Sequence, residues 1–373
     1  MERMDFLVRK DQLTEHRVVT VPRDELAPDT AELAIDRFGF TANNITYAAM
    51  GDAMAYWSFF PTTAPGWGLI PVWGFGTVVR STVAALGVGE RFYGYFPMSS
   101  HLVVQPTRLS DAGFVDGAPH RRARAGVYNQ YLRTTRDPSY RADTELQQVV
   151  LRPLFATSFV LADYLAEHRE FGAEAILISS ASSKLAVGMA FVCKAEPPRG
   201  DRELIGLTSA ANAERVRQLG LYDRVVAYDD VTSLPPARPS ALIDIAGNPA
   251  TRAAIHRHHG DALRHSLVVG STHWDSRAAD ADPGALPGPA PVRFFAPDWF
   301  KQRAEQWTPA GLFGRIAEAW NAFLIPVLDP ARGLLTIVPS AGPDAVARAY
   351  DDMVRGRARA DHGHVMTLAA DAS

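Results

Sequence analysis

The segment with the clearest capacity for chemistry is a serine-rich turn between an apolar strand and an apolar helix. Residues 175–178 predict the strand, residues 179–184 the small polar turn, and residues 185–193 the helix. This order has the topology of a dinucleotide fingerprint, in which a helix N-terminus receives the pyrophosphate. Serine hydroxyls and a lysine ammonium can donate to phosphate oxygens. The predicted phosphate contacts are Ser180, Ser182, Ser183 and Lys184.

The usual glycines of that fingerprint are missing from residues 179–186. Glycine serves there because it lets the backbone approach the pyrophosphate and the helix pack on the strand, and serine and alanine are the next smallest choices. A helix N-cap and a tight turn would also explain these serines. The turn by itself leaves cofactor binding and simple capping both open.

The end of the next predicted strand favours NADP over NAD. An NAD enzyme usually places a carboxylate here for the ribose 2′-hydroxyl. This chain instead offers Thr208, Ser209, Asn212 and Arg215. These groups can donate to a 2′-phosphate, so we expect NADP as the cofactor. The alternative is a polar helix cap with Arg215 in solvent.

These residues sit in a region where predicted strands and helices alternate. Strands are expected at residues 175–178, 203–207, 224–228, 241–245 and 265–269, and helices at 185–193, 210–219 and 249–259. Such alternation implies right-handed crossovers and a parallel sheet covered on both faces. Ligands bind at the carboxyl ends of such strands. Tyr228, at the end of the third strand, is therefore also predicted to contact the cofactor.

The region before this sheet predicts a β-rich domain. Between residues 5 and 109, short runs rich in valine and aromatic residues are separated by glycine and proline. Residues 111–148 show no clear period and predict a long loop or short helices, and connectors of this length are often functional. A helix is expected at 151–168. The predicted domains are 1–148 (β-rich, with the connector), 149–290 (dinucleotide-binding) and 291–373, a C-terminal segment that returns to the first domain.

Composition limits the classes of partner. The chain has 373 residues, 47% of them hydrophobic, and a net charge of −3, so nucleic acid is not an expected partner. The basic run at residues 120–124 is interpreted as a solvated loop. No apolar run of spanning length and no signal segment are apparent, which favours the cytoplasm without membrane contact.

No metal site is expected. Cys193 is the single cysteine and falls in an apolar helical run, which suits a small buried residue. His256 and His259 would share a helix face, but no carboxylate completes a known zinc pattern. These residues and His258 are predicted to be surface histidines.

The order of motifs resembles the medium-chain dehydrogenase/reductase superfamily, in its zinc-free quinone oxidoreductase and enoyl reductase branch. The most specific match is the turn Gly87-Val88-Gly89-Glu90-Arg91-Phe92-Tyr93-Gly94, and residues 71–79 resemble the family's glycine-containing strand. Residues 243–247 and 267–270 look like its later strands with cofactor-side glycines, Gly247 and Gly270. The chain also looks like a member of an uncharacterised group of unknown function with Asn43-Asn44-Ile45-Thr46-Tyr47 and Phe294-Phe295-Ala296-Pro297.

The resemblance implies an α/β fold with a GroES-like β-barrel substrate domain and a Rossmann-type doubly wound parallel sheet. It implies an NADPH-dependent, zinc-independent reductase that delivers hydride to an enone, enoyl thioester or quinone. Homodimers are common in this branch, so a homodimer is possible here. The expected substrate is small and apolar or aromatic.

Without a metal, a phenol is a plausible proton donor to the developing enolate or alkoxide. Tyr56 follows Asn44 at about the spacing of the active-site tyrosine of similar enoyl reductases, and is the first choice, with Tyr47 and Tyr95 in reserve. Asn44 could hold the substrate oxygen or the nicotinamide ribose. Predicted substrate contacts are Trp57, Phe60, Trp73, Tyr95, Trp274 and Phe295. The same aromatic residues could instead be core and rim residues of a β domain.

Two other function classes remain open. One is a non-redox enzyme on the same fold that uses tyrosine or histidine acid-base chemistry, with weak or lost cofactor binding. The other is a binding protein without turnover.

Overall fold

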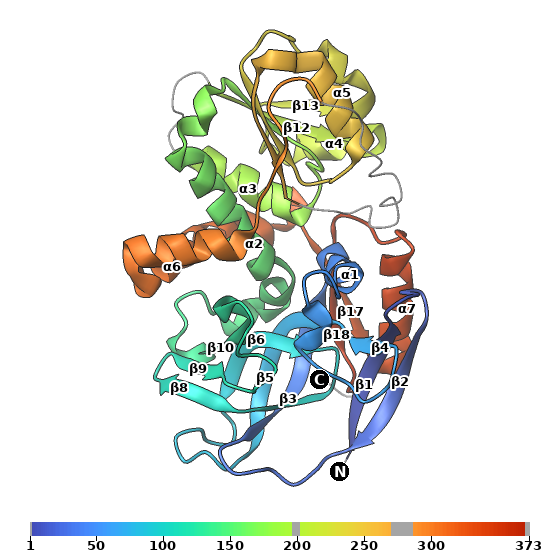
Figure 1. Ribbon diagram of the computed structural model, residues 1–373, viewed down its shortest axis with the longest axis vertical. Helices are drawn as coiled ribbons and strands as arrows, with labels where there is room; N and C mark the ends of the chain where they lie inside the picture. Colours follow the sequence, from blue (N-terminus) through green and yellow to red (C-terminus); the bar gives the residue numbers. More distant parts are fainter. Residues whose placement is uncertain (1, 196–201, 270–285, 370–373) are drawn as a thin grey trace. The chain divides into compact units, whose positions relative to one another are not determined.

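The computed structural model describes residues 2–195, 202–269 and 286–369, which form two compact units (Figure 1). Unit 1 comprises Met1–Pro153 and Thr336–Ser373, and unit 2 comprises Leu154–Leu335. The chain leaves unit 1 within helix α2 (Glu145–Glu167) and returns at strand β17 (Thr336–Ala341). The return thus begins at residue 336 and not at the expected 291.

Unit 1 is built on strands. A three-stranded sheet has the order β2-β1-β4 (His16–Pro22, Glu2–Arg9, Trp67–Leu69). A larger sheet has the order β17-β18-β3-β5-β6-β10-β9-β8, with β7 also paired to β3. Its other strands are β3 Ala31–Phe40, β5 Pro71–Ser81, β6 Arg91–Pro97, β7 His101–Val104, β8 Pro106–Ser110, β9 Gly113–Asp116, β10 Gln130–Arg133 and β18 His362–Thr367.

The C-terminal strands join the larger sheet beside β3. Strand β18, near the C-terminus, pairs antiparallel with β3, and β17 pairs parallel with β18 (Figure 1). The crossover between β17 and β18 is helix α7 (Pro343–Val354), whose Tyr350 hydroxyl donates to the carbonyl of Leu13 at 2.7 Å. The C-terminal segment therefore completes the larger sheet of unit 1.

The connector at residues 111–148 is more ordered than its sequence indicated. It contributes strands β9 and β10, which pair with each other and extend the large sheet through β6. It also holds the short helix η2 (Gly126–Asn129). Helix α2 then begins at Glu145, six residues before the predicted start at 151.

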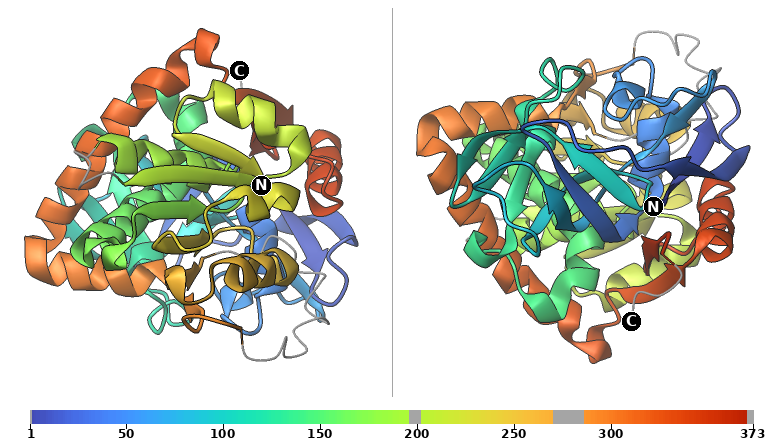
Figure 2. Two further views of the ribbon diagram at one scale, coloured as in Figure 1. Left: turned by 90° about the horizontal axis from the view of Figure 1, so that it is seen from above. Right: turned by 90° about the horizontal axis from the view of Figure 1, so that it is seen from below.

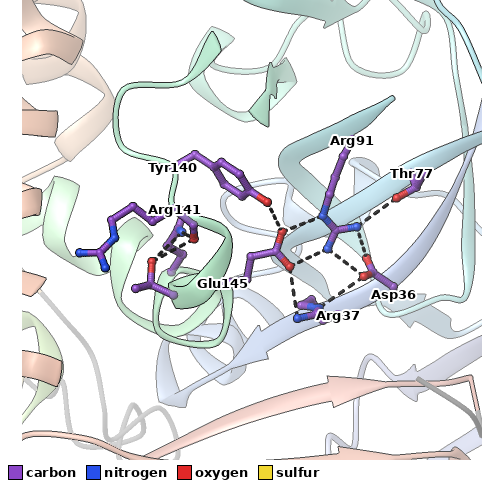
Figure 3. Close-up of polar contacts among 9 residues, drawn as sticks. Asp36, Arg37, Thr77, Arg91, Tyr140, Arg141 and Glu145 are labelled. Carbon is purple, nitrogen blue, oxygen red and sulfur yellow. Dashed lines mark hydrogen bonds and ion pairs between the residues drawn. The ribbon is translucent and has the colours of Figure 1, made fainter. Parts of the chain in front are cut away.

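A charged network holds the start of α2 against the sheet (Figure 3). Arg91, the first residue of β6, donates to Glu145 at 2.7 Å and to Asp36 of β3 at 2.8 Å. Arg37 adds an ion pair with Glu145 at 3.2 Å, and the hydroxyl of Tyr140 donates to the same carboxylate at 2.8 Å. The carboxylate of Glu145 is buried, and it is tolerated there because two arginines and a phenol pair with it.

Gly39 of β3 also permits a close approach of α2. A Cβ at this position would lie 2.1 Å from the carbonyl oxygen of Val149, so only glycine fits without displacing the helix.

The helical segment Ala142–Glu167 is long and apolar enough, by length and composition, to cross a membrane, with a mean hydropathy of 1.5. The apolar run is therefore longer than the sequence analysis expected. Half of its most apolar 18-residue window is buried, and α2 is a partly buried core helix.

Unit 2 contains a six-stranded parallel sheet with the order β13-β12-β11-β14-β15-β16. The strands are β11 Ala175–Ile178, β12 Glu203–Thr208, β13 Arg224–Ala227, β14 Ser240–Asp244, β15 Leu263–Val268 and β16 Val292–Arg293. All four residues of β11 are buried, as expected for a strand covered on both faces. The predicted doubly wound sheet is confirmed.

Helices cover both faces of this sheet. Helices α3 (Lys184–Ala195) and α4 (Ala210–Gln218) connect β11, β12 and β13, and α5 (Pro249–His259) connects β14 to β15. Figure 2 shows α4 and α5 on opposite sides of the strands. The long helix α6 (Ala296–Leu328) belongs to unit 2 and changes direction at Thr308, where φ is 63°.

Candidate functional site

The predicted cofactor residues follow the carboxyl ends of neighbouring parallel strands in unit 2. Ser180, Ser182, Ser183 and Lys184 follow β11, while Thr208 ends β12 and Ser209 follows it; Tyr228 follows β13, and Gly247 follows β14. The sheet order reverses direction between β11 and β14, which is the switch point where such sheets bind ligands. The topology brings these residues to one edge. Gly270 and Trp274 lie outside the described residues.

The serine turn has the backbone shape that the missing glycines would provide. Ser180 has φ 54°, in the left-handed region that glycine adopts most readily. The amide of Ser183 donates to the carbonyl of Ser180 at 2.8 Å and closes the turn. The hydroxyl of Ser183 accepts the amide of Ala186 at 3.3 Å and so caps the first turn of α3. Part of the capping explanation therefore applies to Ser183.

Tyr228 contacts the turn directly. Its hydroxyl oxygen accepts the amide of Ser180 at 2.8 Å. Burial raises the pKa of Tyr228, although the Ser180 amide acts in the opposite direction, so the phenol keeps its proton at neutral pH. A protonated phenol that accepts one hydrogen bond can also donate one.

A buried network that the sequence interpretation missed joins β11 to β14 at the switch point. The hydroxyl of Ser179 donates to Asp244 at 2.9 Å and accepts the amide of Ala246 at 2.9 Å. Asp244 also accepts the amide of Gly247 and pairs with Arg252 of α5 at 2.8 Å. The sequence signal that could have revealed this network is the serine that follows β11, Ser179, together with the aspartate that ends β14, Asp244.

The end of β12 keeps the donors on which the NADP prediction depends. Thr208 is buried, Ser209 is the N-cap of α4, and Asn212 is half-buried. Arg215 is not simply in solvent, because it is half-buried and donates to the carbonyl of Gly333 at 3.1 Å. Glu214, the acidic residue of this helix, is exposed and pairs with Arg217.

The sheet edge of unit 2 combines left-handed turns with hydrogen-bond donors, which is the chemistry that a dinucleotide pyrophosphate requires. Ser180, with φ 54°, and Gly247, with φ 64°, provide the left-handed turns. Helix α3 begins at Lys184, directly after Ser182 and Ser183. One feature departs from this pattern: the amide of Ser180 already has an acceptor in Tyr228.

Unit 1 gathers four tyrosines, here called the phenol cluster: Tyr47 of α1 (Ala42–Ala49), Tyr56 of η1 (Tyr56–Ser58), Tyr95 of β6 and Tyr128 of η2. The hydroxyls of Tyr56 and Tyr128 are 3.5 Å apart. Ring centroids of Tyr47 and Tyr56 are 4.5 Å apart, and those of Tyr95 and Tyr128 are 4.8 Å apart. The structure therefore brings together both predicted catalytic tyrosines.

All four phenols are neutral over the physiological range. Burial is the largest influence on each and raises the pKa of Tyr47, Tyr56, Tyr95 and Tyr128. Contacts with the side chains of Trp73, Asn43 and Tyr128 act in the opposite direction on the pKa of Tyr47 without reversing the rise. These residues can donate protons and hydrogen bonds, but they do not act as bases.

Two predicted substrate residues line the phenol cluster and two others do not. Phe60 and Trp73 pack on Tyr95, with centroid distances of 6.1 Å and 5.0 Å. Trp57 packs instead against Gly51 and Gly68, where a Cβ would lie 2.0 Å and 2.4 Å from its ring, so it is a core residue. Phe295 is the N-cap of α6 in unit 2 and is partly exposed.

Asn44 has a structural task for both ends of its amide. Its oxygen accepts the backbone amide of Thr41 at 2.8 Å in a capping box at the start of α1. Its nitrogen donates to the carbonyl of Pro71 on β5 at 3.0 Å. Asn44 thereby fixes α1, and with it Tyr47, against the sheet.

Tyr128 was not predicted as a site residue, because its segment shows no regular pattern. Hydrogen bonds from Arg121 hold this segment in place. Arg121 is fully buried, so its interpretation as part of a solvated loop is wrong. It donates to Asn129 at 3.0 Å, to Tyr131 at 2.9 Å and to the carbonyl of Tyr128, and it pairs with Asp116. The other basic side chains of residues 120–124 are exposed or half-buried.

The interpretation of His256 and His259 as surface residues is also wrong. Both are buried, and His256 contacts the hydroxyl of Ser266 at 2.8 Å and the carbonyl of Pro287 at 2.9 Å. Cys193 is buried in α3. The described ranges contain no group of three or more histidine, cysteine, aspartate or glutamate side chains able to hold a metal ion.

Residues 38–359 match the family model described as "Protein of unknown function (DUF2855)". The chain belongs to the DUF2855 family. No curated protein matches it. Membership agrees with the resemblance to an uncharacterised group, and it brings no assigned activity.

Solved structures place this DUF2855 chain in the medium-chain reductase fold. It is similar to CurA from Vibrio vulnificus, with a TM-score of 0.60, 11% identity and 98% of each chain covered. It is also similar to the mitochondrial 2-enoyl thioester reductase Etr1p/Etr2p heterodimer from Candida tropicalis, with a TM-score of 0.56, 13% identity, and 98% of this chain and 100% of the other covered. CurA was also solved in complex with NADPH, and that structure matches with a TM-score of 0.59 and 10% identity over 98% of each chain.

At these identities the similarity concerns the fold, which is shared with oxidoreductases. The predicted combination of a GroES-like domain and a Rossmann-type domain is confirmed over the full length of the chain. Substrate, cofactor and site residues stay predictions.

Proposed function

We propose that this DUF2855 protein is an NADPH-dependent, metal-independent reductase of an activated alkene or carbonyl compound. The observation that carries the proposal is the switch point of the parallel sheet, where the left-handed serine turn, the N-terminus of α3 and the Tyr228 hydroxyl converge. These groups offer several donors, and the carboxylate of Asp244 beside the turn is paired with Arg252. That chemistry suits a pyrophosphate.

NADPH, when bound, would supply a hydride to the substrate. Within this proposal Ser182, Ser183 and Lys184 hold the pyrophosphate, and Thr208, Ser209, Asn212 and Arg215 face the ribose 2′-phosphate. Gly247, with φ 64°, leaves room for the cofactor backbone. Gly270, the other predicted cofactor contact, lies outside the described residues. Tyr228 donates its proton to a phosphate oxygen while its own oxygen keeps the Ser180 amide.

Tyr56 is the proposed proton donor. Its pKa is raised by burial, so it is protonated when the substrate arrives, and its hydroxyl lies beside that of Tyr128. The proton moves from Oη of Tyr56 to the enolate or alkoxide of the substrate. Phe60, Trp73 and Tyr95 offer aromatic surface, which favours a small apolar or aromatic substrate.

The test is consumption of NADPH in the presence of a panel of enones, enoyl thioesters and quinones. Tyr56→Phe should lower turnover by about 100-fold, the lower end of the range for general acid catalysis, with the NADPH dissociation constant unchanged. Tyr164→Phe, a half-buried tyrosine of unit 2, is the matched control and should retain turnover. Unchanged turnover in Tyr56→Phe would remove Tyr56 from the mechanism.

One observation favours a second function. Because the Ser180 amide is already bonded to Tyr228, the turn is satisfied without a phosphate. A non-redox enzyme with the same fold, using tyrosine or histidine acid-base chemistry, would show this feature and would bind no nicotinamide.

Under the proposed reductase function, we also propose that the protein is cytoplasmic, can form a homodimer, and has no membrane or nucleic-acid partner.

A further inference from the structure

The phenol cluster contains a hydroxyl that the protein leaves without a partner. Tyr95 is 0% exposed, and its hydroxyl has no hydrogen-bond acceptor or donor within the described ranges. Burying a polar group in this way costs free energy, and native proteins keep such groups mainly where they have a task. Folding alone does not account for the Tyr95 hydroxyl, since phenylalanine would fill the same volume.

Three tyrosines of the cluster pack side by side, with ring-centroid distances of 4.8 Å between Tyr95 and Tyr128 and 6.2 Å between Tyr56 and Tyr128. Tyr56 and Tyr128 are 3.5 Å apart at their oxygens, and the pKa of Tyr95 is raised first by burial and then by the nearby Tyr47, Tyr128 and Tyr56. The ring of Tyr95 packs on the ring of Tyr128. The geometry therefore gathers several phenol donors from β6, η1 and η2.

The surroundings of these hydroxyls are aromatic and neutral. Phe59, Phe60 and Trp73 pack on Tyr95. The cation beside them, Arg121, lies over the rings of Phe59 and Phe60 and is neutralised by Asp116. A ligand here meets flat apolar surface and uncharged donors, which suits a planar uncharged molecule that gains negative charge on one oxygen.

We propose that the hydroxyls of Tyr56, Tyr95 and Tyr128 form an oxyanion-binding site for the carbonyl oxygen of a planar, uncharged conjugated ketone or quinone. The inference rests on the proposed function for its reaction: hydride adds to the substrate carbon, and the displaced electron pair moves to the carbonyl oxygen. Tyr95 and Tyr128 donate hydrogen bonds to that oxygen. The proton then passes from Tyr56 to the substrate, and water restores it to Tyr56 after product release.

Arg121 is the positioning residue of this site. Its guanidinium binds the carbonyl of Tyr128 and the side chain of Asn129, which closes residues 121–129 into a fixed loop. The placement of the Tyr128 hydroxyl beside that of Tyr56 depends on this loop.

Binding of 4-nitrophenolate tests the site without cofactor or turnover, because the probe is planar and its oxyanion absorbs visible light. Wild-type protein should bind the phenolate and shift its absorption band. Tyr95→Phe and Tyr128→Phe should each weaken binding about tenfold, the effect of one hydrogen bond to a charged oxygen. Tyr164→Phe, the control in unit 2, should bind as wild type does. Neutral 4-nitroanisole, which lacks the oxyanion, should show no difference among the four proteins.

Thermal unfolding separates a binding role from a structural one. Tyr95→Phe should keep or raise the melting temperature, because it removes an unpartnered buried hydroxyl. A lowered melting temperature with unchanged phenolate affinity would show that Tyr95 supports the fold and would overturn the inference. Failure of the wild-type protein to bind 4-nitrophenolate would also overturn it. Neither result bears on NADPH binding, so failure of this site and failure of the proposed function are distinguishable.

Discussion

At the scale of single residues, Tyr228 has the most informative contact in unit 2. Tyr228→Phe removes the acceptor of the Ser180 amide and the proposed phosphate donor together. We expect a loss of about 1 kcal/mol in the free energy of unfolding, measured with urea, and a fivefold to tenfold weaker affinity for NADPH.

Tyr222→Phe is the matched control for Tyr228→Phe. The Tyr222 hydroxyl donates to the carbonyl of Ala181 in the same turn at 3.0 Å, and Tyr222 is buried. It should lose a similar amount of stability and keep its NADPH affinity. Equal NADPH affinities in both variants and the wild type would exclude Tyr228 from the cofactor site.

The environment of a residue was predictable from the sequence where neighbouring residues determine it. It was not predictable where a partner on another element determines it. The serine turn and Tyr56 follow from neighbouring residues, and the structure places them at a sheet edge and in an aromatic cluster. Arg121 was misjudged because arginine in an irregular segment is usually solvated. Its partners Asp116, Asn129 and Tyr131 lie 5 to 10 residues away on elements that the sequence did not reveal.

At the scale of elements, the docking of α2 depends on the Glu145 carboxylate (Figure 3). Burial alone would raise the pKa of Glu145, but Arg91, Tyr140 and Arg37 outweigh it and hold the pKa below the usual 4.5. A carboxylate with a lowered folded pKa stabilises the fold at every pH above its unfolded value. That contribution fades as the pH falls from about 4.5 through the folded pKa.

Glu145→Gln should therefore lose about 2 kcal/mol in the free energy of unfolding at neutral pH. The difference from wild type should shrink as the pH is lowered below 4.5, in urea unfolding repeated across pH. Glu214→Gln changes an exposed glutamate paired with Arg217 and should cost less than about 0.5 kcal/mol. A Glu145→Gln loss that stays constant down to the lowest pH would show that the ion pairs with Arg91 and Arg37 are not its cause.

The alternating elements of unit 2 were predictable because strands buried on both faces leave continuous apolar runs between helical segments. Predicted and observed bounds of α5 coincide, at Pro249–His259. Strands β9 and β10 were not predicted, because each has only four residues, too few to show a period in a segment rich in arginine, aspartate, glycine and proline. The predicted start of α2 was wrong, because apolar periodicity begins only at residue 151. The helix itself begins at Glu145, which a charged network holds against the sheet.

At the scale of the whole molecule, the fold was predictable and the function is a proposal. The fold prediction is confirmed because the medium-chain reductase pattern depends on the order of strands, helices and glycine-rich turns, which the sequence keeps at 11% identity. The sequence analysis expected the C-terminal segment to return to the first domain. The return begins at Thr336 because α6 stays in unit 2, where Arg303 pairs with Asp163 and Glu167. The prediction of a nicotinamide cofactor depends on a turn that lacks the usual glycines.

Titration of the purified full-length chain with NADPH and NADH, followed by nicotinamide fluorescence, tests the central claim most directly. We predict saturable binding of NADPH that is tighter than that of NADH, since Thr208, Ser209, Asn212 and Arg215 replace the usual carboxylate. At a concentration of NADPH about 100 times the dissociation constant, binding should stabilise the fold by about 2.7 kcal/mol. Absence of binding by either nucleotide at high micromolar concentration would contradict the account and favour the non-redox alternative.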